Sequence, residues 1–325
     1  MGHVTISSNV SPRVTVLIPS FNAAATLTAA VDSVLDQTMR DVEVLVIDDA
    51  SSDATAAVVA QLTARDRRVR GLRNVENQGK SISMNRGNDA ALGHWIAVLD
   101  ADDRFAPDRL EHLLALGEAE GVDMVVDNQF FVDVLANEVV GTAWPAGEAA
   151  QRLDLETFLA RSNAYAPFSF GMLKPIFRAD FVRRTGLRYE PDARNGQDFF
   201  KLLQFYLYRG TAIVSDLPLY LYSQPFGSKS QKWSHAARKR YDFCQVHQIN
   251  ERFVARARGL LTPTQLAMLE RRSAQLRTLA NFWTIRENVS GGRVADAMFN
   301  AVRYPAATRL ALQRASTKLR HRMAS

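Results

Sequence analysis

The sequence predicts an α/β protein with a central, mostly parallel sheet flanked by helices, followed by a helical C-terminal extension. Through the first hundred residues, short apolar β-branched segments alternate with segments of helical periodicity, an order typical of βαβ units. The apolar segments are nearly continuous, as expected for strands that are covered on both faces. From about Ser234 the composition shifts to Ala, Leu, Arg and Gln at helical spacing. We therefore predict an α/β domain over 1–230 and a basic helical extension over 231–325.

The individual elements follow from the same patterns. Apolar segments predict four strands, at 14–19, 42–47, 69–72 and 95–99. Helical periodicity predicts three connecting helices, at 26–37, 54–64 and 81–92. In the extension, Thr262 followed by Pro263 predicts the start of a helix, because threonine caps a helix and proline suits its first turn. Gly291 and Gly292 predict a second break.

The composition is that of an ordinary globular protein and excludes several classes. Of the 325 residues, 47% are hydrophobic and 23% are charged, which excludes a disordered or collagen-like chain. The single cysteine, Cys244, excludes a disulfide framework and a cysteine-based zinc cluster. The first thirteen residues lack an apolar segment, and no run reaches the roughly 18 apolar residues of a membrane span, so we expect a cytoplasmic protein. A net charge of +6 favours an acidic partner, and no nucleic-acid-binding module is visible.

Polar and acidic side chains follow three of the predicted strands. They are Asn22, Asp48, Asp49, Asp100, Asp102 and Asp103. In open α/β sheets ligands bind beyond the carboxyl ends of the strands, so we expect these side chains to converge on one edge of the sheet. Carboxylates suit Mg²⁺ or Mn²⁺, which take one or two protein carboxylates together with substrate phosphates. For the cluster at 100–103 alone, an acidic turn that caps the following helix is the alternative.

Three blocks of the sequence resemble glycosyltransferase family 2. They are VTVLIPSFNAAATLTAAVDSVLDQT, VEVLVIDDASSDAT and NQGKSISMNRGNDAALGHWIAVLDADD. Their order and spacing match the nucleotide-sugar-binding half of the family over about 100 residues. A weaker resemblance continues through LKPIFRADFV and NGQDFF to about residue 230. The resemblance implies a GT-A fold, a nucleotide-sugar donor, a divalent metal ion and inversion at the anomeric carbon.

The resemblance also assigns roles to particular residues. The loop that holds the nucleobase and ribose is matched by Pro19, Ser20, Phe21 and Asn22. The pair that contacts the base and the ribose is matched by Asp48 and Asp49. The metal and ribose motif is matched by Asp100, Asp102 and Asp103, with Asp102 and Asp103 as the metal ligands. Asp198 matches the general base, which takes the proton of the acceptor hydroxyl.

Positions that are usually arginine in the family differ here. Met84 stands before Asn85 and Arg86 where the family has arginine, so we expect Asn85, Arg86 or Lys80 to contact the donor. Ser223 stands where an arginine would meet the donor phosphates. Lys229 could replace that arginine as a point charge, without its bidentate fork. These departures bear on donor affinity more than on the class of reaction.

The remaining signals set the expected reaction. Gln197 replaces the usual glutamate before the proposed base, and Lys174 could be a surface residue or contact the substrate. The Gln-x-x-Arg-Trp motif of processive members is absent, which favours transfer of one sugar. We therefore expect transfer of one hexose, glucose first, from a UDP-sugar to a lipid-linked oligosaccharide in exopolysaccharide or surface polysaccharide biosynthesis.

Two alternatives come from other classes of protein. A nucleotide-sugar-binding scaffold without turnover is favoured by the missing arginines and disfavoured by Asp102 and Asp198. A nucleotidyltransferase would carry a Gly-rich phosphate loop after the first strand, where this chain has residues 19–22 instead. The basic C-terminal helices could bind an anionic membrane surface at the inner face of the cell membrane, the acceptor, or a second chain in a homodimer.

Overall fold

The computed structural model describes residues 11–147, 149–166, 168–224 and 241–323, which belong to two compact units. Unit 1 comprises residues 1–154, 171–192 and 197–231. Unit 2 comprises residues 155–170, 193–196 and 232–325. The second unit therefore takes in two short segments that the sequence places within the α/β domain.

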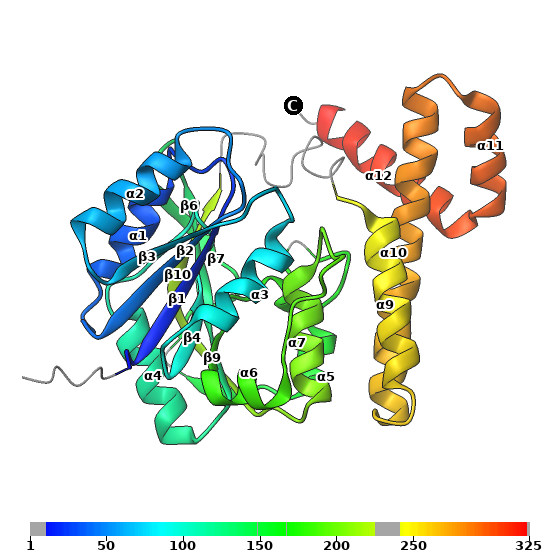
Figure 1. The fold of residues 1–325 in the computed structure, drawn as a ribbon. Coiled ribbons are helices and arrows are strands. Elements are labelled where there is room, and N and C mark those ends of the chain that lie inside the picture. The colour runs from blue at the N-terminus through cyan, green and yellow to red at the C-terminus, as the bar shows by residue number, and fades with distance from the viewer. Residues whose placement is uncertain (1–10, 148, 167, 225–240, 324–325) are drawn as a thin grey trace, which may run out of the picture. The chain divides into compact units, whose positions relative to one another are not determined.

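Unit 1 is built on one mixed sheet. Its described strands are β1 (Val14–Ser20), β2 (Val42–Asp48), β3 (Val69–Arg73), β4 (Trp95–Val98), β5 (Arg104–Phe105), β6 (Met124–Asp133), β7 (Glu138–Thr142), β8 (Ala150–Arg152), β9 (Ile176–Arg178) and β10 (Ala212–Gln224). The strand order is β3-β2-β1-β4-β9-β6-β10-β5, with β7 beside β6 and β8 beside β10 (Figure 1). The four predicted strands are confirmed as β1 to β4.

Parallel pairing is concentrated among the predicted strands. β1 pairs in parallel with β2 and with β4, and β2 pairs in parallel with β3. β9 then joins antiparallel to both β4 and β6, while β6 and β10 form a long parallel pair. The sheet is thus parallel in its N-terminal half and mixed beyond it. Because β1, β2 and β4 run in the same direction, their carboxyl ends meet at one edge.

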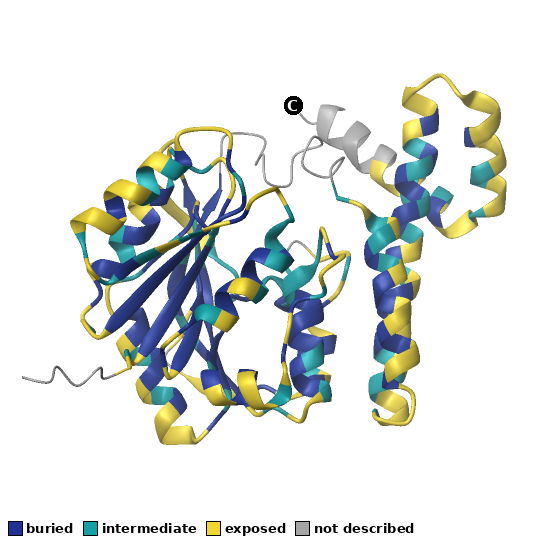
Figure 2. Cartoon of the chain, viewed as in Figure 1, coloured by how far each residue is buried: buried dark blue, intermediate teal, exposed yellow. Residues whose placement is uncertain are grey.

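Helices cover both faces of this sheet, which explains the continuous apolar strands. The helices of unit 1 are α1 (Leu27–Leu35), α2 (Thr55–Arg65), α3 (Lys80–Ala90), α4 (Arg109–Glu120), α6 (Ala179–Thr185) and α7 (Gln197–Leu207). β1 and β2 are buried along their length (Figure 2). Val16 and Val44 pack in the core cluster with α1 and α4, whereas Leu17 and Ile47 face α3. The three helices predicted between the first strands are confirmed as α1 to α3.

The close approach of α3 to the sheet depends on Gly87. A Cβ atom at this position would lie 3.0 Å from Ile47 Cδ1 and 3.2 Å from Leu17 Cδ2, so a larger residue would push the helix away. The approach places the first residue of the helix, Lys80, beside the carboxyl ends of the strands.

Unit 2 is helical. Its described helices are α5 (Leu155–Ala160), α9 (Phe243–Ala257), α10 (Pro263–Ser290), α11 (Val294–Arg303) and α12 (Pro305–Met323). α9, α11 and α12 all pack against the long helix α10 (Figure 1). At the start of α10, Thr262 and Gln265 form a capping box and Pro263 occupies the first turn, as predicted. The predicted break at Gly291 and Gly292 is confirmed as the turn between α10 and α11. None of the described helices has the length and apolar composition needed to cross a bilayer.

Candidate active site

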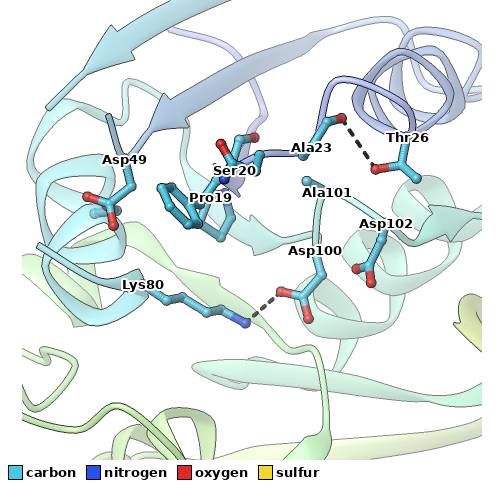
Figure 3. A pocket seen from close by; sticks show the side chains of 12 residues that line it. Pro19, Ser20, Ala23, Thr26, Asp49, Lys80, Asp100, Ala101 and Asp102 are labelled. Atoms are coloured by element: carbon cyan, nitrogen blue, oxygen red, sulfur yellow. Dashed lines mark hydrogen bonds and ion pairs between the residues drawn. The ribbon is translucent and has the colours of Figure 1, made fainter. Parts of the chain in front are cut away.

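A pocket of about 480 Å³ opens at the carboxyl ends of β1, β2 and β4 (Figure 3). It is lined by Pro19, Ser20, Phe21, Asn22, Ala23, Thr26, Asp49, Lys80, Ser83, Asp100, Ala101 and Asp102. The structure therefore brings together most of the residues that the resemblance assigned to the donor. Four others lie outside this lining, namely Asp48, Asn85, Arg86 and Asp103. Lys229 lies outside the described residues.

The loop after β1 is fixed by Asn22. This residue has a φ of 51°, in the left-handed region that asparagine tolerates. Its side-chain oxygen accepts a hydrogen bond from the Ser52 backbone N–H at 2.9 Å, and its own N–H donates to Ser51 Oγ at 2.9 Å. These bonds tie the loop after β1 to the loop after β2. The neighbouring Phe21 is half-exposed and offers an apolar ring on which a nucleobase could stack.

The consecutive carboxylates of Asp48 and Asp49 serve different contacts. Asp48 is buried and accepts from Arg73 Nη1 at 2.8 Å, outside the pocket. Asp49 lines the pocket and accepts from Asn74 Nδ2 at 2.7 Å, and from the backbone N–H groups of residues 78 and 79 at 3.0 and 2.7 Å. The Asp49 carboxylate thereby fixes the loop that leads into α3.

The carboxylate oxygens of Asp100, Asp102 and Asp103 all lie within 4.8 Å of one another. A set of carboxylate oxygens at this spacing fits a hard divalent cation such as Mg²⁺ or Mn²⁺. Asp103 is buried, and it accepts from the Tyr220 hydroxyl at 2.7 Å and from the Ser223 N–H at 2.8 Å. Asp102 is exposed and lines the pocket. The geometry therefore favours Asp102 as the direct ligand, with Asp103 anchoring the turn.

Two lysines connect Asp100 to Asp198, the residue that resembles the general base. Lys80 Nζ lies 2.6 Å from Asp100 Oδ1 (Figure 3) and 3.8 Å from Asp198 Oδ2. Lys174 Nζ lies 3.0 Å from Asp100 Oδ2 and 2.6 Å from Asp198 Oδ2. The acidic cluster and the candidate base are thus joined by ion pairs, although they are almost 100 residues apart in sequence.

Lys174 carries a permanent charge in this network. Its side chain is buried, and burial alone would lower its pKa. The charges of Asp100 and Asp198 outweigh burial and raise the pKa of Lys174 well above its usual value. Lys174 therefore stays protonated and cannot itself take a proton from a substrate at neutral pH. Its position suits it to orient the Asp198 carboxylate.

A buried ion pair holds the backbone at Lys174. Arg109 contacts Asp127 through two hydrogen bonds, of 2.9 Å from Nε and 2.8 Å from Nη2. Nη2 also donates to the carbonyl oxygen of Lys174 at 2.6 Å. The guanidinium lies 4.2 Å from the centroid of the Phe105 ring and 5.3 Å from that of Tyr220. Strands β5, β6 and β10 thereby support the segment that places Lys174.

Asn85 reaches the site through Tyr189. Its Nδ2 donates to the Tyr189 carbonyl at 2.9 Å, and its Oδ1 accepts from the Tyr189 N–H at 2.8 Å. The Tyr189 side chain lies close enough to Asp198 for the charge of that carboxylate to act on its hydroxyl. Burial, followed by the charge of Asp198, raises the pKa of Tyr189 well above its usual value, so this hydroxyl stays protonated.

The positions around Asn85 do not supply a cation to the pocket. Arg86 donates to the Arg73 carbonyl at 2.6 Å and to Asn74 Oδ1 at 2.7 Å, so it supports the loop behind Asp49. Met84 is fully buried. Among the described residues that line the pocket, Lys80 therefore supplies the positive charge that could meet donor phosphates.

Three residues with clear roles in this site were not assigned by sequence reasoning: Lys174, Tyr189 and Tyr220. Lys174 sits between apolar residues just before a strand, and a lysine in such a position is a signal of a buried ion pair. Tyr189 and Tyr220 had no comparable signal, because a buried tyrosine is ordinary and only the fold shows which carboxylate its hydroxyl meets.

Comparison with known proteins decides the family. Residues 15–177, half of the chain, match the profile of Glycosyl transferase family 2. The chain is a member of glycosyltransferase family 2. This family member is 34% identical to the succinoglycan biosynthesis protein ExoO of Rhizobium meliloti. The match spans 223 residues, 68% of this chain and 63% of that protein. It is 33% identical over 190 residues to ExoU of the same organism, 57% of this chain and 54% of that protein. Both matches span less than two thirds of the relative.

Solved structures show the same fold. The complex of S. aureus TarS 1-349 with UDP-GlcNAc superposes with a TM-score of 0.61 at 15% identity, covering 85% of this chain and 73% of that one. The mannosyltransferase PcManGT from Pyrobaculum calidifontis, in complex with GDP-Man and Mn²⁺, gives a TM-score of 0.56 at 21% identity, covering 94% and 81%. The predicted GT-A fold of this family 2 member is thereby confirmed.

Proposed function

We propose that this chain transfers a single hexose, with inversion, from a UDP-sugar to a hydroxyl of a lipid-linked oligosaccharide. Glucose is the first donor sugar to test. The observation that carries the proposal is the placement of Asp198, which Lys174 joins to the acidic cluster at the donor pocket. The names of the Rhizobium relatives, succinoglycan biosynthesis proteins, support a role in exopolysaccharide or surface polysaccharide biosynthesis. The proposal places the chain at the inner face of the cell membrane.

The pocket residues divide the work of binding the donor. The Phe21 ring would stack on the nucleobase, and the Lys80 ammonium would contact the phosphates. Asp49 fixes the loop that forms one side of the pocket. Asp102, with Asp100 and Asp103 beside it, would hold Mg²⁺ or Mn²⁺. When bound, the metal ion would neutralise charge on the departing diphosphate. Lys80 can reach either Asp100 or a phosphate, so donor binding is expected to compete with its ion pair.

Asp198 would act as the general base. A carboxylate that takes the proton of the acceptor hydroxyl must lie within hydrogen-bond reach of it and must keep a fixed direction. Lys174 Nζ binds the Asp198 carboxylate at 2.6 Å, which restricts its rotation. The acceptor oxygen then attacks the anomeric carbon, the bond to the diphosphate breaks, and the proton passes to Asp198. Attack from the side opposite the leaving group gives inversion.

The test is donor hydrolysis and transfer with a panel of nucleotide sugars and Mg²⁺ or Mn²⁺. We compare the wild type with Asp102→Ala, Asp198→Asn and the matched control Asp180→Asn, an exposed carboxylate at the start of α6. We expect nucleoside diphosphate release from one donor, lost by roughly 10²- to 10⁴-fold in Asp198→Asn and unchanged in the control. Asp198→Asn should still bind the donor, whereas Asp102→Ala should lose metal-dependent donor binding.

A donor-binding scaffold without turnover is the second candidate. It is favoured by the ion pair that occupies Asp198 and by Met84 and Ser223 at positions where the family has arginine. Donor binding measured by calorimetry separates the two. Metal-dependent binding with no release, and no transfer to lipid-linked acceptors, would favour the scaffold. Absence of binding for every donor in the panel would contradict both.

A further inference from the structure

Helix α11 carries an apolar face that is exposed. Val294, Met298 and Val302 recur every four residues, and Phe299 lies next to Met298 on the helix surface. Their exposed fractions are 62%, 66%, 84% and 63%, respectively. Ala297 is buried on the other side of the helix, where α11 packs on α10 and α12. Figure 2 shows the outer surface of α11 as exposed. In the part of the chain that the structure describes, nothing covers this face.

Arginines lie at both ends of this helix, and others follow on α12, where Arg314 packs over Phe282 of α10. Arg293 and Arg303 lie at the two ends of α11, and Arg309 and Arg314 lie on α12, all of them exposed. The Arg303 guanidinium lies 5.9 Å from the centroid of the Phe299 ring, at the border of the apolar face. From residue 288 to 314, Asp296 is the single acidic residue. Exposed apolar side chains bordered by arginines are the pattern of a helix that lies in the headgroup region of an anionic membrane.

Over the whole chain, too, the basic residues are concentrated in the C-terminal part. Residues 232–325 contain 18 lysines and arginines against 5 aspartates and glutamates. Residues 1–231 contain 22 against 29. The net charge of +6 therefore hides a strongly basic C-terminal region beside an acidic remainder. A negatively charged membrane surface would attract the first and repel the second.

We propose that α11 docks on an anionic lipid surface, with Val294, Met298, Phe299 and Val302 inserted at the level of the headgroups and the arginines of α11 and α12 on lipid phosphates. The helix is ten residues long, about 15 Å, so it can lie in the interface but cannot span the bilayer. Nucleic acid is disfavoured as the occupant, because its phosphates would need cations on the face that here is apolar. The proposal adds a docking surface to the membrane location in the proposed function.

The test is co-sedimentation of the full chain with vesicles, without nucleotide sugar. One set is phosphatidylcholine alone, and the other contains phosphatidylglycerol as well. We expect binding to the anionic vesicles, weakened by salt, and little binding to the neutral ones. Met298→Glu/Phe299→Glu should reduce the partition at least about tenfold. The control Leu92→Glu/Leu260→Glu makes the same change in charge at exposed leucines outside α11 and should bind as the wild type does.

A second variant makes the result independent of a loss of folding. Phe299→Trp should show tryptophan fluorescence quenched by brominated phosphatidylglycerol more strongly than the wild type, which places residue 299 in the lipid. Three results would overturn the proposal: no binding of the wild type to anionic vesicles, equal loss in the test and control variants, or a dimer in solution that Met298→Glu/Phe299→Glu dissociates while vesicle binding persists. If the chain bound RNA, and Met298→Glu/Phe299→Glu bound it equally well, the basic residues would serve nucleic-acid binding instead. Since no sugar is transferred in this assay, its failure would leave the proposed reaction standing.

Discussion

Residues 14–103 and residues 104–224 contribute to the same candidate site in different ways. In the first region, acidic and polar side chains stand directly after strands, and each loop is fixed by neighbours from the next loop, as Asn22 is by residues 51 and 52. In the second region, the groups that matter are buried and far apart in sequence. Lys174 and Tyr220 meet their carboxylate partners only through the folded sheet. The first region forms the donor pocket, and the second fixes the direction of the candidate base.

The largest effect is expected from Arg109, which supports the second region. Arg109→Met leaves the buried Asp127 carboxylate without its partner and removes the hydrogen bond to the Lys174 carbonyl. Breaking a buried pair in this way costs about 3–5 kcal/mol of the free energy of unfolding. Urea unfolding of the wild type and the variant measures this loss in the free energy of unfolding. The exposed pair of Arg184 and Asp180 is the control, and Arg184→Met should cost less than about 1 kcal/mol. Equal losses in the two variants would contradict the supporting role of Arg109.

The two lysines sharpen the comparison, because they contact the same two carboxylates from different environments. Lys174 is buried, whereas Lys80 is partly exposed and lines the pocket. We expect Lys174→Met to lower kcat of the proposed transfer by roughly 10- to 100-fold with a small change in the donor KM. Lys80→Met should mainly raise the donor KM. Steady-state kinetics with varied donor separates these outcomes, and an increase of KM alone in Lys174→Met would show that Lys174 contacts the donor instead.

Lys201 on α7 gives a prediction about pH. It is buried without a hydrogen-bond partner among the described residues, and burial lowers its pKa to about 7. The unfolded chain holds this proton up to about pH 10, so between pH 7 and pH 10 the unfolded state binds more protons and stability rises with pH. Lys201→Met should therefore stabilise the fold at pH 7, and the gain should vanish near pH 10.

The size of this gain is limited by two aromatic rings. Lys201 Nζ lies 4.6 Å from the centroid of Phe177 and 4.2 Å from that of Tyr189, and both ring faces stabilise its charge. We therefore expect a gain at pH 7 smaller than the roughly 4 kcal/mol that a pKa of about 7 implies, measured by chemical unfolding across the pH range. A gain that stayed constant up to pH 10 would show that better packing, and not the charge, is the cause.

The smallest effect is expected at Arg86. It contacts the Arg73 carbonyl and Asn74 and does not line the pocket, so its charge lies behind the loop that Asp49 fixes. Arg86→Gln should change the donor KM by less than about threefold, since an exposed polar contact contributes little. Lys80→Gln is the matched variant inside the pocket and should have the larger effect. A larger change of the donor KM in Arg86→Gln than in Lys80→Gln would show that Arg86 contacts the donor, as the family resemblance led us to expect.

Much of the first region could be predicted from the sequence. The apolar strands, their connecting helices and the acidic residues at strand ends were expected in order, because periodicity and turn residues act within a few positions. Apart from the helix that follows the acidic cluster, the strands and helices between residue 104 and residue 224 were not predicted. β5, β8 and β9 are only two or three residues long, too short for a periodic pattern, and they exist because a longer strand pairs with them.

The sequence by itself therefore determined the class of fold, the place of the pocket and the basic helical end of the chain. It could not separate Asp48 from Asp49, because adjacent side chains on a strand end point in opposite directions and only the neighbouring loops decide which one reaches the pocket. It could not assign Lys174, because the charge of a buried lysine depends on which carboxylates the fold places within about 3 Å of it. Tertiary structure decided both points, since long-range electrostatic contacts leave no periodic trace along the chain.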